Sequence, residues 1–247
     1  MHKTLHRLLL LVVALATGAI SLIAVAPAAH AATYPTVTKI SSTKSTVLHG
    51  TTVKIYGCGQ APSYAGEACA PFGTLTLQRR VVGGSWTNIS ARYPSPENAR
   101  PSWVITPSAS AYYRVAWNGG SFESNTFSPT AADDRQTRLI RVARNLHDKW
   151  VQSSFTFGGL VTPTYAGKYV YIQRTTCSNP QSTSCKWSYY KAIKTTSSSR
   201  WSVKLPAYSQ TNYFRAYVKP SSGYAPSYSR YYIETKRYRP ATPRLVR

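Results

Sequence analysis

Apolar and polar side chains alternate over short runs through most of the chain beyond residue 32. Thr52–Tyr56 and Ser154–Phe157 show the alternation, and a glycine follows each run. Further runs rich in β-branched and aromatic residues are Thr74–Leu77, Tyr169–Ile172 and Tyr213–Val218. A two-residue period is that of a strand with one buried face, and Gly, Pro, Ser and Asn between runs are typical of turns. Several such strands at regular intervals predict an all-β fold of the β-sandwich class.

The two halves of the chain repeat each other. Gln78, Trp86 and Pro107 of the first half correspond to Gln173, Trp187 and Pro206 of the second, at offsets of 95, 101 and 99 residues. Trp103 and Trp201 also correspond, as do Tyr112–Val115 and Tyr213–Ala216. A repeat of about 100 residues is one domain length, longer than a solenoid turn. The sequence therefore predicts two tandem domains, at residues 33–132 and 133–235.

The segment between the halves fits two patterns. Leu139, Val142 and Leu146 share one face of a helix with arginines opposite, but the run is also rich in strand-forming residues. In the first half Thr36–Ile40 precedes its glycine by about the distance at which this run precedes Gly158. We therefore predict Leu139–Arg144 to be the first strand of the second domain.

A motif in the second half resembles a known family. It runs Gly159-x-Val161-x-Pro163-x-Tyr165-x-Gly167-Lys168-x-Val170-x-Ile172-Gln173-Arg174, followed by Trp187, Arg200–Val203 and Tyr213–Arg215. This pattern resembles the immunoglobulin-like β-sandwich repeats of secreted actinobacterial proteins. In the first half, Cys58–Ala70 replaces the Pro-x-Tyr-x-Gly-Lys turn. The resemblance implies spacer, adhesion or binding modules at a cell surface, without shared catalytic residues.

The N-terminus has the order of a signal peptide. Lys3 and Arg7 precede the apolar run Leu8–Val25, and Pro27 and the small-x-small site Ala29–Ala31 follow it. The alternative is an uncleaved membrane anchor. We predict a cleaved signal over residues 1–32, no transmembrane segment in the mature chain, and a secreted protein that is extracellular or associated with the cell wall.

Four cysteines lie beyond the signal, which agrees with an oxidising destination. Cys58 and Cys69 fall in the first half and Cys177 and Cys185 in the second, which favours one disulfide in each domain. A zinc site would need CxxC-like spacing, whereas the intervals are 10 and 7 residues. The sequence predicts two disulfides, no metal and no cofactor.

Groups able to carry catalysis are scarce. Beyond the signal only His49 and His147 remain, with seven carboxylates in all. His147 and Asp148 are sequence neighbours in a predicted turn, so on an extended chain they would point opposite ways. Asp133 and Asp134 are predicted to be solvated linker residues. We predict no catalytic residues; the alternative of a secreted enzyme would need His49, His147 or a carboxylate.

The aromatic residues divide into two groups. The recurring tryptophans Trp86, Trp103, Trp187 and Trp201 are predicted to pack in the core or between the sheets, whereas Trp117 and Trp150 do not recur and are freer to be exposed. Arg114 and Arg215 recur within strands and are predicted to stack on or pair with a neighbour. Tyrosines crowd the second half. They are either platforms for sugar rings or bases, or edge-strand residues with no ligand.

Charge is the main functional signal. The whole chain carries +23, and residues 133–247 hold twenty Lys or Arg against four Asp or Glu. Such an excess attracts polyanions, and no nucleic-acid-binding motif accompanies it. The predicted polyanion-binding residues are Arg135, Arg138, Arg141 and Arg144 at the domain junction, and Lys236, Arg237, Arg239, Arg244 and Arg247 in a basic, flexible tail over 236–247.

The sequence leaves the ligand open. Teichoic acid, acidic polysaccharide and non-specifically bound nucleic acid are the expected partners. Alternatively, the basic composition only keeps the protein soluble and loosely associated with the wall. A different class of function is a carbohydrate- or protein-binding adhesion module that uses exposed tyrosine and tryptophan.

Overall fold

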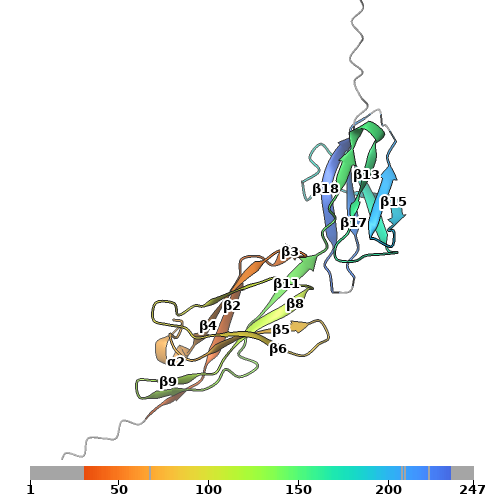
Figure 1. Ribbon diagram of the computed structural model, residues 1–247. Coiled ribbons are helices and arrows are strands. Elements are labelled where there is room, and N and C mark those ends of the chain that lie inside the picture. The colour runs from red at the N-terminus through yellow and green to blue at the C-terminus, as the bar shows by residue number, and fades with distance from the viewer. Residues whose placement is uncertain (1–30, 67, 207, 209, 222, 235–247) are drawn as a thin grey trace, which may run out of the picture.

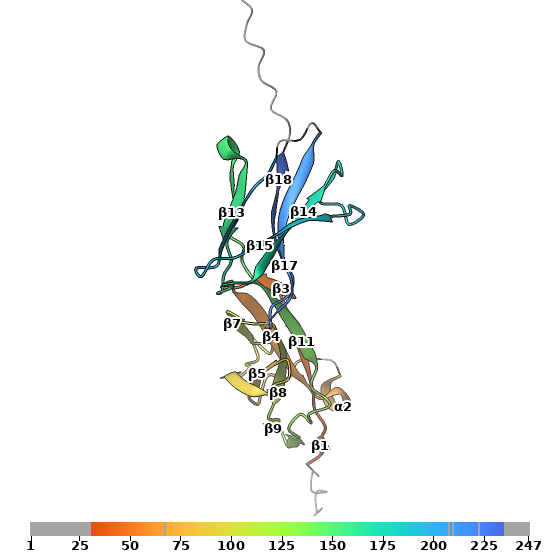
Figure 2. The same ribbon diagram turned by 90° about the vertical axis from the view of Figure 1, so that its right-hand side faces the viewer.

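The computed structural model describes residues 31–66, 68–206, 208, 210–221 and 223–234. Strands make up nearly all of its regular structure, and Figures 1 and 2 show them gathered in two β-sandwich domains joined end to end. The prediction of an all-β protein with two tandem immunoglobulin-like sandwiches is confirmed. In the described part of the chain, no helix is both long enough and apolar enough to span a bilayer.

The first domain consists of two sheets around one core. One sheet has the order β2-β4-β7 and the other β3-β11-β8-β5-β6, while the small sheet β1-β10-β9 extends one end. The strands are β1 (Thr33–Tyr34), β2 (Val37–Ser42), β3 (Thr46–Leu48), β4 (Val53–Gln60), β5 (Leu75–Val81), β6 (Thr87–Arg92), β7 (Ser102–Ile105), β8 (Ala111–Trp117), β9 (Gly120–Phe122), β10 (Asn125–Phe127) and β11 (Thr137–Ala143). A single short helix, α2 (Pro62–Ala65), follows β4.

Trp117 lies in the core of the first domain, so the prediction that it is freer to be exposed is wrong. It is 1% exposed, contacts Phe72 and Phe127, and donates its indole N–H to the Phe72 carbonyl at 3.0 Å. Gly59 makes room for this indole, because a Cβ there would lie 2.4 Å from the ring. The equivalent position of the second domain, at the end of β17, holds the smaller Val218, which is also buried.

The second domain has seven strands in sheets of three and four, an immunoglobulin-like arrangement. The sheets have the orders β12-β13-β16 and β15-β14-β17-β18. The strands are β12 (Lys149–Val151), β13 (Thr156–Leu160), β14 (Tyr169–Thr175), β15 (Ser188–Lys194), β16 (Arg200–Lys204), β17 (Asn212–Val218) and β18 (Ser227–Glu234). A one-turn 3-10 helix at Gln152–Ser154 occupies the start of the run that the sequence predicted as strand from Ser154. The core includes Phe157, Ile172, Trp201 and Phe214.

The segment before the second domain is a strand, but it belongs to the first domain. β11 pairs antiparallel with β8, where Thr137 lies opposite Arg114, and parallel with β3. Its residues Ile140 and Val142 are fully buried in the first core. The domain boundary at 132/133 is therefore wrong, and the change of domain comes just after β11. The strand itself was predicted correctly, but the comparison with Thr36–Ile40 assigned it to the wrong domain, because Ile140 and Val142 fill the first core.

The loop between β17 and β18 docks on the first domain. Tyr224 donates its hydroxyl to the Ser108 carbonyl at 2.7 Å and packs against the first core. The Ser110 backbone N–H donates to the Gly223 carbonyl, and the Ala225 N–H to the Val142 carbonyl, both at 2.8 Å. The joint is therefore built from backbone hydrogen bonds between segments far apart in the sequence.

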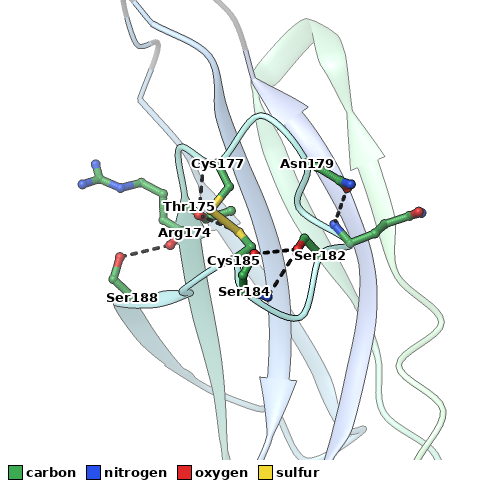
Figure 3. The surroundings of a disulfide bond; sticks show 9 residues. Arg174, Thr175, Cys177, Asn179, Ser182, Ser184, Cys185 and Ser188 are labelled. Atoms are coloured by element: carbon green, nitrogen blue, oxygen red, sulfur yellow. Dashed lines mark hydrogen bonds between the residues drawn. A yellow bond between two sulfur atoms is a disulfide. The ribbon is translucent and has the colours of Figure 1, made fainter.

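Both predicted disulfides are confirmed, Cys58–Cys69 and Cys177–Cys185. The second closes a loop between the ends of β14 and β15, shown in Figure 3. There the Thr175 hydroxyl accepts the Cys177 backbone N–H at 3.2 Å, and the Ser188 hydroxyl donates to the Arg174 carbonyl at 3.0 Å.

Candidate functional site

The predicted arginine cluster at the junction does not form one surface. Arg135 is half-buried and donates twice to the Thr130 carbonyl, at 3.0 and 2.6 Å. Arg138 and Arg141 are exposed, but their separation by three residues along β11 sends them to opposite faces of the strand. Only these two of the four cations are open to a polyanion.

Arg144 is buried at the joint, 5% exposed, and is not available to a polyanion. Its Nη1 donates to the carbonyls of Pro163 and Thr164, at 3.0 and 3.3 Å. The guanidinium lies over the rings of Tyr224 at 4.0 Å and Tyr165 at 4.9 Å. Burial lowers the pKa of Arg144, and the two tyrosines offset part of that shift. Its assignment as a polyanion contact is therefore corrected: it is a structural residue.

Other predicted residues lie outside the described part of the chain. These are the signal over residues 1–30 and the tail cations Lys236, Arg237, Arg239, Arg244 and Arg247. Within the described residues, no group of three or more His, Cys, Asp and Glu could hold a metal ion. Asp133 and Asp134 are exposed, but they precede β11 within the first domain and not between domains.

The neighbours His147 and Asp148 have separate partners. His147 Nε2 lies 2.8 Å from the Thr162 hydroxyl, whereas Asp148 forms an ion pair with Arg230 at 3.1 Å. Asp148 also accepts the Tyr232 hydroxyl at 2.5 Å. Burial first, and then this hydrogen bond and charge, raise the pKa of Tyr232 to about 12.

A Gln–Arg–Trp arrangement recurs on the outer faces of both domains. Arg114 donates to Gln78 Oε1 at 2.8 Å and lies 4.1 Å over the Trp86 ring. In the second domain, Arg215 donates to Gln173 Oε1 at 2.8 Å and lies 4.2 Å over Trp187. The prediction that these arginines stack and pair is confirmed. Trp86 and Trp187 are half-exposed on this face, so the prediction that they pack in the core or between the sheets is wrong; Trp103 and Trp201 are buried as predicted.

The outer face of the second domain's four-stranded sheet is aromatic. Tyr189 is 66% exposed, and Tyr169 and Tyr228 are each about half exposed. Ring contacts link the face across strands, with Tyr171–Tyr217 at 6.3 Å and Tyr217–Tyr228 at 5.0 Å. Strand register places the following tyrosines on this face: Tyr169, Tyr171, Tyr189, Tyr213, Tyr217, Tyr228 and Tyr231. We call these residues, with Gln173, Trp187, Arg215 and Lys219, the tyrosine face.

Two hollows indent the tyrosine face. The first, of about 260 Å³, is lined by Tyr171, Gln173, Tyr189, Tyr217 and Lys219. The second, of about 450 Å³, lies between the face and the disulfide loop, and its lining is Pro180–Thr183, Cys185, Trp187, Arg215, Ser229 and Tyr231. Gln173 of the first hollow and Arg215 of the second are hydrogen-bonded to each other, so the hollows adjoin.

A larger groove of about 810 Å³ lies on the opposite sheet and reaches the edge strand β15. Its floor contains Gly158, Gly159 and Trp201. Strand register puts Lys149 opposite Gly158, and Arg200 opposite Leu160, on the outside of this sheet. The cationic residues that line it are Lys149, Lys194 and Arg200, with His147 beside them, and its lining contains no Asp or Glu. We call this the basic groove.

Carboxylates are nearly absent from the second domain. Residues 145–234 hold eleven Lys or Arg and two Asp or Glu, an excess of nine positive charges. One carboxylate, Asp148, is paired with Arg230, and the other, Glu234, is 2% exposed. Burial raises the pKa of Glu234. Asp148 is therefore compensated by Arg230, and Glu234 is removed from the surface.

The tyrosine face could be predicted from the sequence in part, whereas the basic groove could not. The tyrosine content pointed to exposed aromatics, but their common face depends on strand register. The basic groove carried no sequence signal, since Lys149, Lys194 and Arg200 come from three strands and are spread over some fifty residues.

No protein-family model and no curated protein matches the chain. Among solved structures, it is similar to the human OSCAR ligand-binding domain at 13% identity, covering 82% of this chain and 100% of that one, with a TM-score of 0.32. It is also similar to a chain of a cytokine receptor complex at 10% identity, covering 80% and 96%, with a TM-score of 0.35. These scores carry no inference about what this chain binds.

Proposed function

We propose that the chain is a secreted, non-catalytic protein that binds extracellular polyanions through its second domain. The observation that carries the proposal is the basic groove, which has three exposed cationic side chains and a histidine along it and no carboxylate in its lining. A hollow of several hundred Å³ with an apolar floor and a few polar groups is the usual form of a ligand site.

The charge of the whole domain supports the same proposal. An excess of nine positive charges over residues 145–234 creates a field that concentrates polyanions near the groove. Exposed Arg138 and Arg141, together with the tail cations, add to this field. Disulfides in both domains fit an oxidising compartment, which supports the predicted secretion.

The test is retention of the mature chain on immobilised heparin and on isolated cell wall across a salt gradient. The informative variant is Lys149→Gln with Arg200→Gln. Its matched control is Lys44→Gln with Arg92→Gln, which removes the same charge from exposed positions of the first domain. A third protein lacks residues 236–247.

We expect the groove variant to elute at clearly lower salt than its matched control, because the site and not total charge holds the ligand. The truncated protein should elute between wild type and the groove variant. Equal elution of the groove variant and the control, or retention indifferent to salt, would contradict the proposal.

A further inference from the structure

We infer that the tyrosine face binds an acidic polysaccharide, with sugar rings seated in its two adjoining hollows. The inference shares with the proposed function only the expectation of an anionic ligand. It concerns a different sheet, a different chemistry of contact and a ligand with a specific building block.

The tyrosine face is not required by the fold. The core is filled by the alternate residues of the same strands, including Val170, Ile172 and Phe214, which are fully buried. The solvent side of an antiparallel sheet is ordinarily polar. Seven tyrosines and a tryptophan on that side form a contiguous, partly exposed aromatic surface, and such a surface marks a binding site.

The shape of the face fits a chain of rings and not a single small molecule. The hollow at Tyr171 and the hollow under the disulfide loop share a border at the hydrogen-bonded pair Gln173–Arg215. A ligand that crosses this border occupies both. The Arg215 guanidinium donates to Gln173 and lies 4.2 Å over the Trp187 ring and 4.5 Å over the Tyr228 ring, so it is a fixed part of the wall.

The tilt of the rings favours a sugar over a nucleic-acid base. Tyr171 meets Tyr189 at 59° and Tyr217 at 46°, so the rings form the walls of a hollow and not two parallel faces that would enclose a planar base. A pyranose ring is thick, stacks its C–H face on one aromatic ring and presents hydroxyls around its rim. Phenol groups in the first hollow, and Gln181, Ser182 and Thr183 in the second, supply partners for those hydroxyls.

The charge of the face favours an acidic sugar. Lys219 lies 4.6 Å over the Tyr171 ring, at the first hollow, and its ammonium is placed to meet a carboxylate on a sugar seated there. The two carboxylates of residues 145–234 are elsewhere, with Asp148 paired to Arg230 and Glu234 buried. An anionic polysaccharide therefore meets attraction and no repulsion from carboxylates of the domain.

The test measures affinity for polygalacturonate, with dextran as the neutral glycan, and uses polyphosphate and a single-stranded oligonucleotide as other polyanions. The variants are Tyr189→Ala and Lys219→Gln, both at exposed positions, and the matched control is Tyr93→Ala, at 71% exposure in the first domain. We expect Tyr189→Ala to weaken polygalacturonate binding on the order of tenfold, as the loss of one aromatic contact predicts.

Salt separates the two contributions. The defect of Tyr189→Ala should persist at about 0.5 M salt, where charges are screened within a few ångströms. The binding defect of Lys219→Gln should be present at low salt and should vanish at about 0.5 M salt. Polyphosphate binding should be unchanged in Tyr189→Ala, and Tyr93→Ala should behave as wild type.

Three results would overturn the inference: no binding of polygalacturonate by the wild type, unchanged binding by Tyr189→Ala, or a larger loss for the oligonucleotide than for the glycan. The last result would assign the face to bases. The Lys149/Arg200 variant distinguishes this inference from the proposed function. If that variant keeps its heparin retention while Tyr189→Ala loses polygalacturonate binding, the proposed role of the basic groove is wrong and the inference about the tyrosine face is supported.

Discussion

Arg144 offers the sharpest test of the structural reasoning, because sequence and structure assign it opposite roles. The sequence places it among the polyanion-binding cations, whereas the structure buries it between the domains. Its substitution by Ala removes two hydrogen bonds to the carbonyls of Pro163 and Thr164 and the contact with the Tyr224 ring. Arg144→Lys keeps the charge but cannot reproduce the planar fork.

The magnitude is a balance of opposing contributions. Hydrogen bonds from a charged donor contribute about 1.5–3 kcal/mol each, and a cation over an aromatic ring about 0.5–2 kcal/mol. Against these stands the cost of burying a guanidinium with no carboxylate partner, several kcal/mol per ion. Arg144 is only 5% exposed, and this burial lowers its pKa, the direction that such a cost predicts. We expect Arg144→Ala to lose about 2–4 kcal/mol of the free energy of unfolding, and Arg144→Lys about half as much.

The assay is urea denaturation followed by tryptophan fluorescence, together with heparin elution of the folded variants. A buried structural arginine predicts a lower unfolding midpoint with unchanged elution for Arg144→Ala. Exposed Arg141→Gln provides the comparison, with an unchanged midpoint and earlier elution. The reasoning is refuted if Arg144→Ala unfolds like wild type and elutes as early as Arg141→Gln.

Two further predictions concern stability and ionisation. Replacing Cys58 and Cys69 together by Ser opens a loop with a sequence separation of 11 residues, so the free energy of unfolding should fall by about 2.8 kcal/mol in the chain-entropy model; an unchanged thermal midpoint under oxidising conditions would contradict this. Tyr232 has a pKa of about 12 in the folded chain, above its ordinary value of 10.0, so its contribution to stability is complete below pH 10 and is lost as the pH rises towards 12. Asp148→Asn should lower that pKa, and ultraviolet titration of the phenols should show one fewer late-ionising tyrosine; an identical titration curve would exclude the Asp148 hydrogen bond as a cause.

The all-β class, the two-domain repeat and the disulfides were predictable because each depends on local or near-local pattern. Alternation of apolar residues directly reports which face of a strand is buried. The cysteines of each pair are 11 and 8 residues apart, so each disulfide closes a short local loop. The recurring Arg114 and Arg215 also revealed their structural role, since a charged residue repeated within a strand needs a fixed partner.

The errors share a physical cause. Trp117 was expected to be exposed because it has no counterpart, but the space above Gly59 belongs to the first domain alone. Trp86 and Trp187 were expected inside because they recur, yet what recurs is their stacking under an arginine on the outer face. Repetition indicates that an interaction is shared and does not indicate whether it is buried.

The sequence by itself determined the all-β class, the repeat of two domains, the cysteine pairs and the excess of positive charge, because period, spacing and composition are properties of the chain. Only the tertiary structure decided which sheet receives β11, which arginine is buried and which cations share a groove. Those outcomes depend on register and on contacts between strands far apart in sequence. A shift of one residue in register moves every side chain of a strand to the other face, and no local pattern fixes which distant strand lies beside it.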